Sequence, residues 1–170
     1  MRLTFSNDCL DACDILGDHG RTLYRVSTNG FPPQATITKV NGPNDNTEVL
    51  GAINWGSNTI LFKGNEMYAD DLFRKRCFSK DRSFVGPDGH TYKWKIQNPN
   101  CSLKRQDTGE ELARYNRQHR DFRSPAHPPH LQVSLLSGDL LDLVVVTFIY
   151  AKHSSNRVQQ RRWWRRYRAS

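Results

Sequence analysis

"LLDLVVVTFIY", residues 140–150, is the stretch that decides the fold of this chain. Nine of its eleven residues are apolar or aromatic, and only Asp142 and Thr147 interrupt them. The chain as a whole is polar, with a mean hydropathy of −0.74. A membrane span needs about 20 apolar residues, so this run is too short to be one. It is also too uniformly apolar for a half-exposed helix or strand, so we expect the rest of the chain to surround it.

The residues alone leave the secondary structure of this run open. Asp139, directly after Gly138, is suited to cap a helix over about 139–153. Three consecutive valines, 144–146, together with Thr147 and Ile149, instead favour a strand. Periodicity does not decide between the two. A helix that is apolar on all sides would need a complete shell, and an antiparallel barrel of short strands is one such shell. In a helix, Asp142 can sit in the first turn, and the Thr147 hydroxyl can bond a carbonyl one turn back.

Most of the preceding sequence predicts short strands. Apolar and β-branched residues alternate with polar ones in residues 2–6, 23–28, 35–40, 47–55, 59–63, 102–106, 112–115 and 130–135. The clearest hairpin is "SFVGPDGHTYKWKI", where Asp88-Gly89 forms the turn and Tyr92, Trp94 and Ile96 alternate after it. A short helix is expected over 70–75. The stretch therefore lies at the end of a mainly β chain.

Six segments carry a resemblance to a known family. They are "MRLTFSND", "LYRVST", "GAINW", "FVGPDGHTYKWKI", "ELARYNR" and "LLDLVVVTFIY". Their order over about residues 1–153 resembles a family of fungal, mostly basidiomycete, domains of unknown function. That family in turn resembles the tubby-like group, with LURP-one-related proteins and phospholipid scramblases. The resemblance implies a closed antiparallel β-barrel of about twelve strands around a central apolar helix, which we place at about 139–153.

The resemblance implies a fold but gives little information about function. The wider group includes phosphoinositide-binding and membrane-associated proteins, but no lipid-binding residue transfers to this sequence by a motif match. One fold hosts many activities. Function is therefore argued from the residues themselves.

Length and charge divide the chain into a domain, 1–153, and a tail, 154–170. A chain of 170 residues is one domain by size. Its net charge is +8, from 25 basic and 17 acidic residues, and residues 157–170 hold six arginines and no acid. Without these arginines, 19 basic residues face 17 acidic ones, so the body is nearly neutral. An acidic partner is thus expected at the tail.

The tail is the candidate site for a membrane or another polyanion. Its residues are Arg157, Arg161, Arg162, Trp163, Trp164, Arg165, Arg166, Tyr167 and Arg168. Indole rings favour the water–lipid boundary, and an arginine near an anionic leaflet contributes about 1 kcal/mol. The same residue types suit nucleic acid, with arginines on phosphates and tryptophans stacked on bases. The alternative without function is a solvated tail, or Trp163 and Trp164 packed back on the barrel.

Other candidate sites have simpler structural explanations. Cys9 and Cys13 lack a second ligand pair, although His127 and His130 are near each other in sequence, so we expect no metal site. Trp55, Tyr92 and Trp94 could stack on a ligand, but alternating aromatics are more often core residues. No nucleophile elbow, phosphate loop, zinc-protease or dinucleotide motif is present. We expect a non-enzyme with no catalytic residue and no cofactor.

The sequence thus predicts a binding module for anionic, including phosphoinositide-bearing, membrane surfaces. Nucleic-acid binding and small-ligand binding inside a barrel are the alternatives. The opening residues carry no apolar signal-peptide core, because Asp8, Asp11 and Asp14 interrupt them. We therefore expect a cytoplasmic protein, with a peripheral membrane or nuclear location also open.

Overall fold

In a computed structural model of the chain, the structure describes residues 1–7, 9–42, 46–73, 80–117, 127–134 and 136–167, and only the backbone of 156–167. These residues form twelve strands and two helices, joined by turns and loops. The elements are β1 (Arg2–Phe5), β2 (Cys13–Leu16), β3 (Thr22–Asn29), β4 (Gln34–Asn41), β5 (Asn46–Asn54), β6 (Thr59–Phe62), β7 (Asn65–Tyr68), α1 (Ala69–Leu72), β8 (Arg82–Val85), β9 (Thr91–Gln97), β10 (Asn100–Arg105), β11 (Glu111–Asn116), β12 (His130–Val133) and α2 (Gly138–Tyr167).

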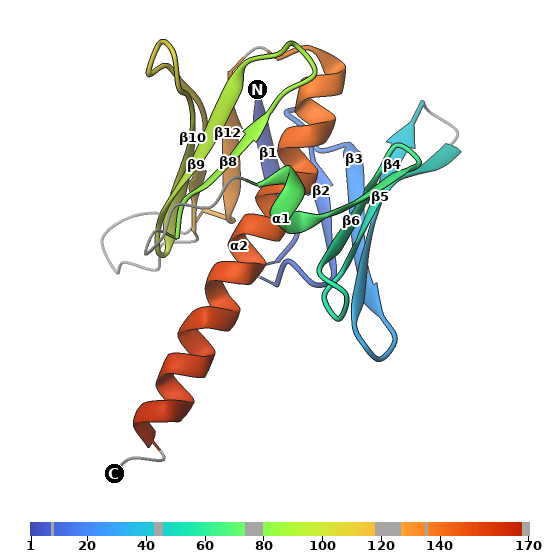
Figure 1. The fold of residues 1–170 in the computed structure, drawn as a ribbon. Coiled ribbons are helices and arrows are strands. Elements are labelled where there is room, and N and C mark those ends of the chain that lie inside the picture. The colour runs from blue at the N-terminus through green and yellow to red at the C-terminus, as the bar shows by residue number, and fades with distance from the viewer. Residues whose placement is uncertain (8, 43–45, 74–79, 118–126, 135, 168–170) are drawn as a thin grey trace.

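The strands form one antiparallel sheet that curls around α2 (Figure 1). The order is β7-β6-β5-β4-β3-β2-β1-β12-β11-β10-β9-β8. Each strand therefore pairs with its neighbour in sequence, except where β1 meets β12 with Leu3 opposite Leu131. That single long-range pairing joins an N-terminal meander to a C-terminal one. The predicted mainly β fold with a C-terminal helix is confirmed, as is the Asp88-Gly89 turn between β8 and β9.

Among the described residues, the strand pairing does not close the sheet into the predicted barrel. Within the described residues no ladder joins the two edge strands, β7 and β8. The short helix α1 lies between these edges (Figure 1). Directly after it, the buried Phe73 ring packs edge-on against Phe84 of β8 at 6.2 Å and stacks on Tyr150 of α2 at 4.9 Å. Side-chain packing, rather than backbone hydrogen bonding, thus spans the seam between the edges.

Residues 140–150 lie in the buried part of α2. Residues 142–152 are all buried, in an unbroken series. Successive residues of a helix point about 100° apart, so such a series is covered on every side. Strand propensity spans only about 1 kcal/mol, and a strand inside the sheet would leave its own backbone groups without ladder partners. The helix is favoured because its backbone N–H and C=O groups form hydrogen bonds within the helix itself.

Both ends of the predicted helix differ from the observed ones. The Leu141 N–H donates to the Ser137 carbonyl, so Asp139 lies inside the first turn and is not its cap. At the other end α2 continues without a break past residue 153, where the sequence placed the boundary, to Tyr167. The division into a domain and a tail stays a prediction, but its two parts share one helix.

Three polar residues fix the axial position of α2 within its apolar surroundings. Asp142 accepts hydrogen bonds from β3 and β4, and Thr147 accepts one from β9. Lys152 Nζ donates to the Pro99 carbonyl in the β9–β10 turn. These three polar residues are five residues apart, or about 7.5 Å along the axis between neighbours. Apolar contacts alone are not directional. We infer that these three contacts stop the helix from sliding or rotating in the sheet.

Candidate functional site

The predicted binding residues lie on the last turns of α2, beyond the strands (Figure 1). The backbone of Arg157–Tyr167 is helical, whereas Arg168 lies outside the described residues. At about 100° per residue, positions 163, 164 and 167 fall within an arc of about 100°. The five arginine positions 157, 161, 162, 165 and 166 fall within a separate arc of about 180°. The helix thus separates aromatic from basic positions, which is typical of helices that lie at a membrane surface.

A buried acidic cluster sits near the start of α2. Asp142 is 2 % exposed and accepts hydrogen bonds from the Tyr24 hydroxyl and from Lys39 Nζ, each at 2.8 Å. Lys63 Nζ lies 3.5 Å from the same carboxylate and 2.5 Å from exposed Asp139. Burial and the Asp142 charge raise the pKa of Tyr24 far above its usual value, so Tyr24 stays a hydrogen-bond donor. The expected position of Asp142 in the first turn is wrong, because α2 begins at Gly138 and its first turn carries Asp139 instead. The partners of Asp142 are distant in sequence and could not be identified from local patterns.

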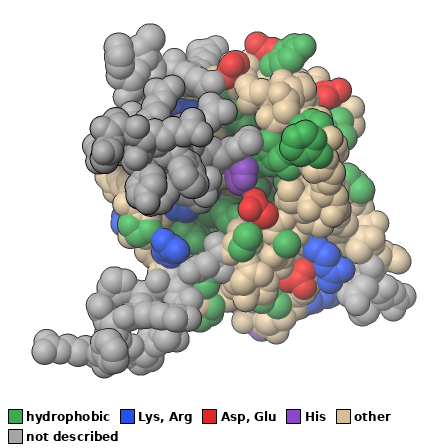
Figure 2. All heavy atoms as spheres, turned by 90° about the horizontal axis from the view of Figure 1, so that it is seen from below, with side chains coloured by type: hydrophobic (Ala, Val, Ile, Leu, Met, Phe, Trp, Pro, Cys, Tyr) green, Lys and Arg blue, Asp and Glu red, His purple; other side chains and the backbone are tan. Residues whose placement is uncertain are grey.

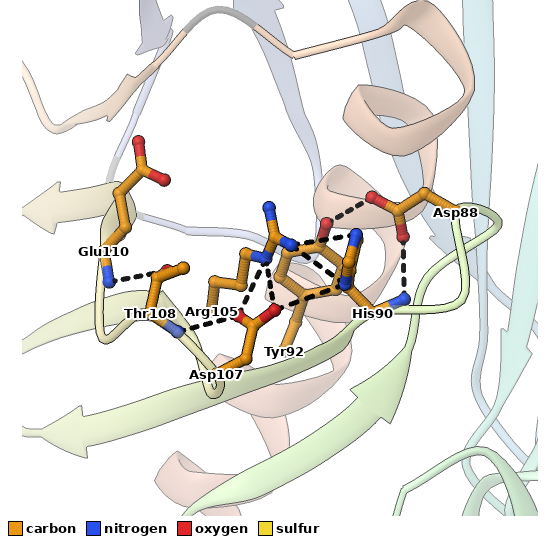
Figure 3. Close-up of polar contacts among 7 residues, drawn as sticks. All are labelled: Asp88, His90, Tyr92, Arg105, Asp107, Thr108 and Glu110. Carbon is orange, nitrogen blue, oxygen red and sulfur yellow. Dashed lines mark hydrogen bonds and ion pairs between the residues drawn. The ribbon is translucent and has the colours of Figure 1, made fainter.

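A second polar cluster joins the β8–β9 turn to the β10–β11 turn (Figure 3). The Tyr92 hydroxyl donates to Asp88 at 2.5 Å, and the His90 N–H donates to the other Asp88 oxygen at 3.2 Å. Arg105 Nε pairs with Asp107 at 2.8 Å, and its Nη2 lies 3.0 and 2.9 Å from the two His90 ring nitrogens. The charged side chains of Asp88, Arg105 and Asp107 each contact another member, whereas Glu110 takes part through its backbone, whose N–H donates to the Thr108 hydroxyl at 3.3 Å. We interpret the cluster as a structural connection between turns.

The pKa values in this cluster follow from those contacts. Burial, followed by the Asp88 contact, raises the pKa of Tyr92 to about 12. Burial alone would raise the pKa of Asp88, but hydrogen bonds from Tyr92 and from the His90 N–H bring it below its usual value. The hydrogen bond from Arg105 lowers the pKa of Asp107. Sequence reasoning identified the Asp88-Gly89 turn and the strands on either side of the β10–β11 turn. It did not identify the contact between the two turns, because a turn motif does not specify which turns are neighbours.

Of the three aromatic residues considered for ligand stacking, Tyr92 and Trp94 lie in the core and Trp55 lies partly exposed. Trp94 and Tyr92 are buried at 0 % and 2 % exposure, which confirms the simpler core interpretation for both. Trp94 Nε1 donates to the Thr147 hydroxyl at 3.1 Å, and that hydroxyl donates to the Leu143 carbonyl one turn back at 2.8 Å. Trp55 is only half-buried and packs on α2, stacked on Tyr150 at 5.6 Å.

A hollow of about 240 Å³ lies at the seam between the sheet edges. Its lining comes from β7, α1, β8 and the start of β9, and consists of Met67, Asp71, Leu72, Phe84, Val85 and Thr91. A small-ligand barrel would need a cavity beside α2, and α2 contributes no residue to this hollow. The hollow therefore gives no support to the small-ligand alternative.

The thiols differ sharply in access. Cys9 is exposed, whereas Cys13 and Cys101 are buried, and Cys77 lies outside the described residues. Burial raises the pKa of Cys13 and of Cys101 to about 12 in each case. The described residues hold no group of three or more His, Cys, Asp or Glu side chains that could bind a metal ion.

We expect a thiol reagent at neutral pH to modify Cys9 of the native protein while Cys13 and Cys101 remain protected. The reactive species is the thiolate, and a thiol with a pKa of about 12 is almost wholly protonated at neutral pH. Peptide mass mapping of a Cys77→Ser variant measures this directly, and denaturant should make all three react. Rapid native labelling of Cys13 or Cys101 would contradict the buried positions.

The comparisons with known proteins give a family and nothing finer. The model of a family of unknown function (DUF6593) matches residues 7–157. The chain belongs to this family. Its matched region begins after β1, covers β2 to β12 and the buried part of α2, and ends at Arg157, the first arginine of the candidate site. No curated protein and no solved structure matched the chain.

Across the residues that the structure describes, neither helix combines the length and the apolar content needed to cross a bilayer. The 30 residues of α2 would be long enough, but its second half is basic.

Proposed function

We propose that this protein is a non-enzymatic module that binds anionic membrane surfaces, including phosphoinositide-bearing ones, through the last turns of α2. One observation carries the proposal: the central helix continues past the sheet as a helix whose aromatic and basic positions lie on different sides. Lying along a bilayer, such a helix places its aromatic side at the headgroup boundary and its arginines against lipid phosphates.

The charge distribution supports a surface contact rather than a deep one. The near-neutral body gives little attraction of its own, while each of the six arginines contributes about 1 kcal/mol near an anionic leaflet. That attraction is long-range and is weakened by salt, because the Debye length is about 8 Å at physiological ionic strength. Membrane association should thus be reversible and sensitive to lipid charge.

The resemblance to fungal domains and to the tubby-like, LURP-one and scramblase group belongs to the same proposal. A twelve-stranded antiparallel sheet curled around an apolar C-terminal helix supports that kinship at the level of architecture. Full closure of the sheet, as in that group, would require the seam between β7 and β8 to close by packing. A cytoplasmic protein that is recruited to membranes fits this proposal.

We expect Arg161→Gln with Arg165→Gln to weaken binding to vesicles of phosphatidylcholine and phosphatidylserine about thirtyfold, at about 1 kcal/mol for each arginine. The matched control removes two exposed positive charges from the body, Arg21→Gln with Lys95→Gln, and should bind almost as the parent does. Vesicle sedimentation at one salt concentration measures all three proteins, beside a version that ends at Asn156.

The same assay decides between the membrane and nucleic acid. Equal sedimentation of the parent and the version ending at Asn156 would remove the helix end as the membrane site. Retention on single-stranded DNA with no vesicle binding, lost steeply as salt rises, would instead favour the nucleic-acid alternative. Vesicles of phosphatidylcholine alone supply the uncharged reference surface.

A further inference from the structure

The turn between β3 and β4 presents the most exposed large apolar side chain among the described residues. Phe31 is fully exposed, at 101 %, and is followed by Pro32 and Pro33. The neighbouring turn, between β5 and β6, is Trp55-Gly56-Ser57-Asn58. Residues 29–34 and 54–59 contain no charged side chain. We name these two turns, 29–34 and 54–59, the neutral tip.

The neutral tip is braced internally. The Trp55 N–H donates to the Pro33 carbonyl at 3.2 Å, which ties one turn to the other. Gly56 lies so close to Pro32 that a Cβ on Gly56 would be 2.6 Å from the proline Cβ. Asn54 Oδ1 in turn accepts from the Gly56 N–H at 2.9 Å. Phe31 therefore projects from a fixed support.

The neutral tip is also connected to α2. The Trp55 ring stacks on Tyr150 and lies 3.9 Å from the His153 ring, measured between centroids. Arg157, the first arginine of the candidate site, follows His153 by four residues, or one helical turn. Asp11 also reaches this contact, where it pairs with His153 Nε2 at 3.2 Å. The tip thus contacts α2 one helical turn before the first arginine of the candidate site.

Both features protrude from the same end of the sheet. Figure 1 shows the β3–β4 turn and the last turns of α2 extending beyond the strands in the same direction. Figure 2 looks onto this end, where hydrophobic side chains reach the surface between charged ones. A flat surface that touches the basic turns can therefore touch the tip as well.

We propose that Phe31 is a second membrane contact, inserted into the lipid surface beside the basic turns of α2. This inference rests on the membrane association proposed above and adds to it an apolar anchor that fixes orientation. An exposed aromatic ring on an uncharged tip gains free energy at the headgroup boundary, and no carboxylate on the tip repels anionic lipid. Two contacts on one rigid unit, unlike a helix alone, also prevent the protein from rolling on the membrane.

Vesicle sedimentation of Phe31→Ser tests the proposal, with phosphatidylcholine and phosphatidylserine in equal amounts. We expect the partition coefficient to fall about tenfold, equivalent to about 1.4 kcal/mol, because the phenylalanine ring is no longer buried in the lipid surface. The matched control is Val49→Ser, which removes another exposed apolar side chain at a position opposite Thr38, away from the tip. Unchanged thermal unfolding of both variants is expected, since both side chains are exposed.

A depth measurement complements the affinity measurement. Phe31→Trp should retain binding and add fluorescence that brominated lipid quenches, relative to the parent with its four tryptophans. Parent binding with equal binding of Phe31→Ser and no added quenching in Phe31→Trp would overturn the insertion of Phe31 while leaving the helix site intact. No vesicle binding by the parent would instead overturn the proposed function itself.

Discussion

Phe148→Ala should lower the free energy of unfolding by about 3–5 kcal/mol, the range for truncating a large buried aromatic residue. Phe148 is 1 % exposed and is the point where three parts of the sheet meet on α2. Its ring centroid lies 5.5 Å from Phe5 of β1, 5.6 Å from Trp94 of β9 and 5.1 Å from Tyr115 of β11. These partners come from both meanders of the sheet, so the cavity left by alanine cannot close by a local shift.

Denaturant unfolding measures this change, with the midpoint falling while the denaturant dependence stays constant. Phe31→Ala is the matched control, because it makes the same substitution at a fully exposed site and should shift stability by less than about 0.5 kcal/mol. A loss below about 1 kcal/mol for Phe148→Ala would mean that the sheet does not enclose the helix as described.

Asp142→Ala should cost a similar amount, about 3–5 kcal/mol, for a different reason. Asp142 is the shared acceptor of the Tyr24 hydroxyl and the Lys39 ammonium, each 2.8 Å away. Without it, a buried hydroxyl lacks its acceptor and a partly buried ammonium lacks its counter-ion. Removing one partner of a buried pair is more costly than the pair itself is worth, so the effect exceeds any net contribution of the salt bridge.

Two variants separate the charge from the hydrogen bonds. Asp139→Ala removes the other carboxylate near Lys63, but that side chain is 75 % exposed, so little change is expected. Asp142→Asn retains an oxygen that can accept from Tyr24 and should fall between the parent and the alanine variant. Spectroscopic titration adds a second readout: the pKa of Tyr24, raised by burial and then by Asp142, should fall in Asp142→Ala but stay above its usual value. Equal stability of the two alanine variants would contradict the buried cluster.

Local patterns in the sequence predicted most of the sheet. Alternation and turn residues located the "GPDG" hairpin and strands such as β4, because both signals lie within a few residues of chain. They missed β2, Cys13–Leu16, and β7, Asn65–Tyr68, and the residues of β7 are mostly exposed and show no apolar alternation. The short helix expected over 70–75 is observed at Ala69–Leu72, and its expected end lies outside the described residues.

The candidate site was predicted in its composition but not in its arrangement. The arginines and tryptophans after residue 156 are visible in the sequence, but their composition predicted a tail distinct from the domain. The structure instead makes them the continuation of the central helix, which gives their positions a shared periodicity. Phe31 carried no sequence signal, since one phenylalanine in a proline-rich turn is ordinary until its exposure and neighbours are known.

The sequence by itself determined that residues 140–150 must be buried on all sides, because transfer of apolar surface from water depends on composition and not on topology. It also determined that the excess positive charge lies at the end of the chain, because charge is additive along a sequence. Only the tertiary structure decided that the buried run is a helix and that Asp142 accepts a hydrogen bond from Tyr24 and pairs with Lys39. It also decided that, among the described residues, α1 rather than a ladder lies at the seam. Each of these depends on residues more than 40 positions apart, or on which edges a curved sheet brings together, and short-range patterns contain neither.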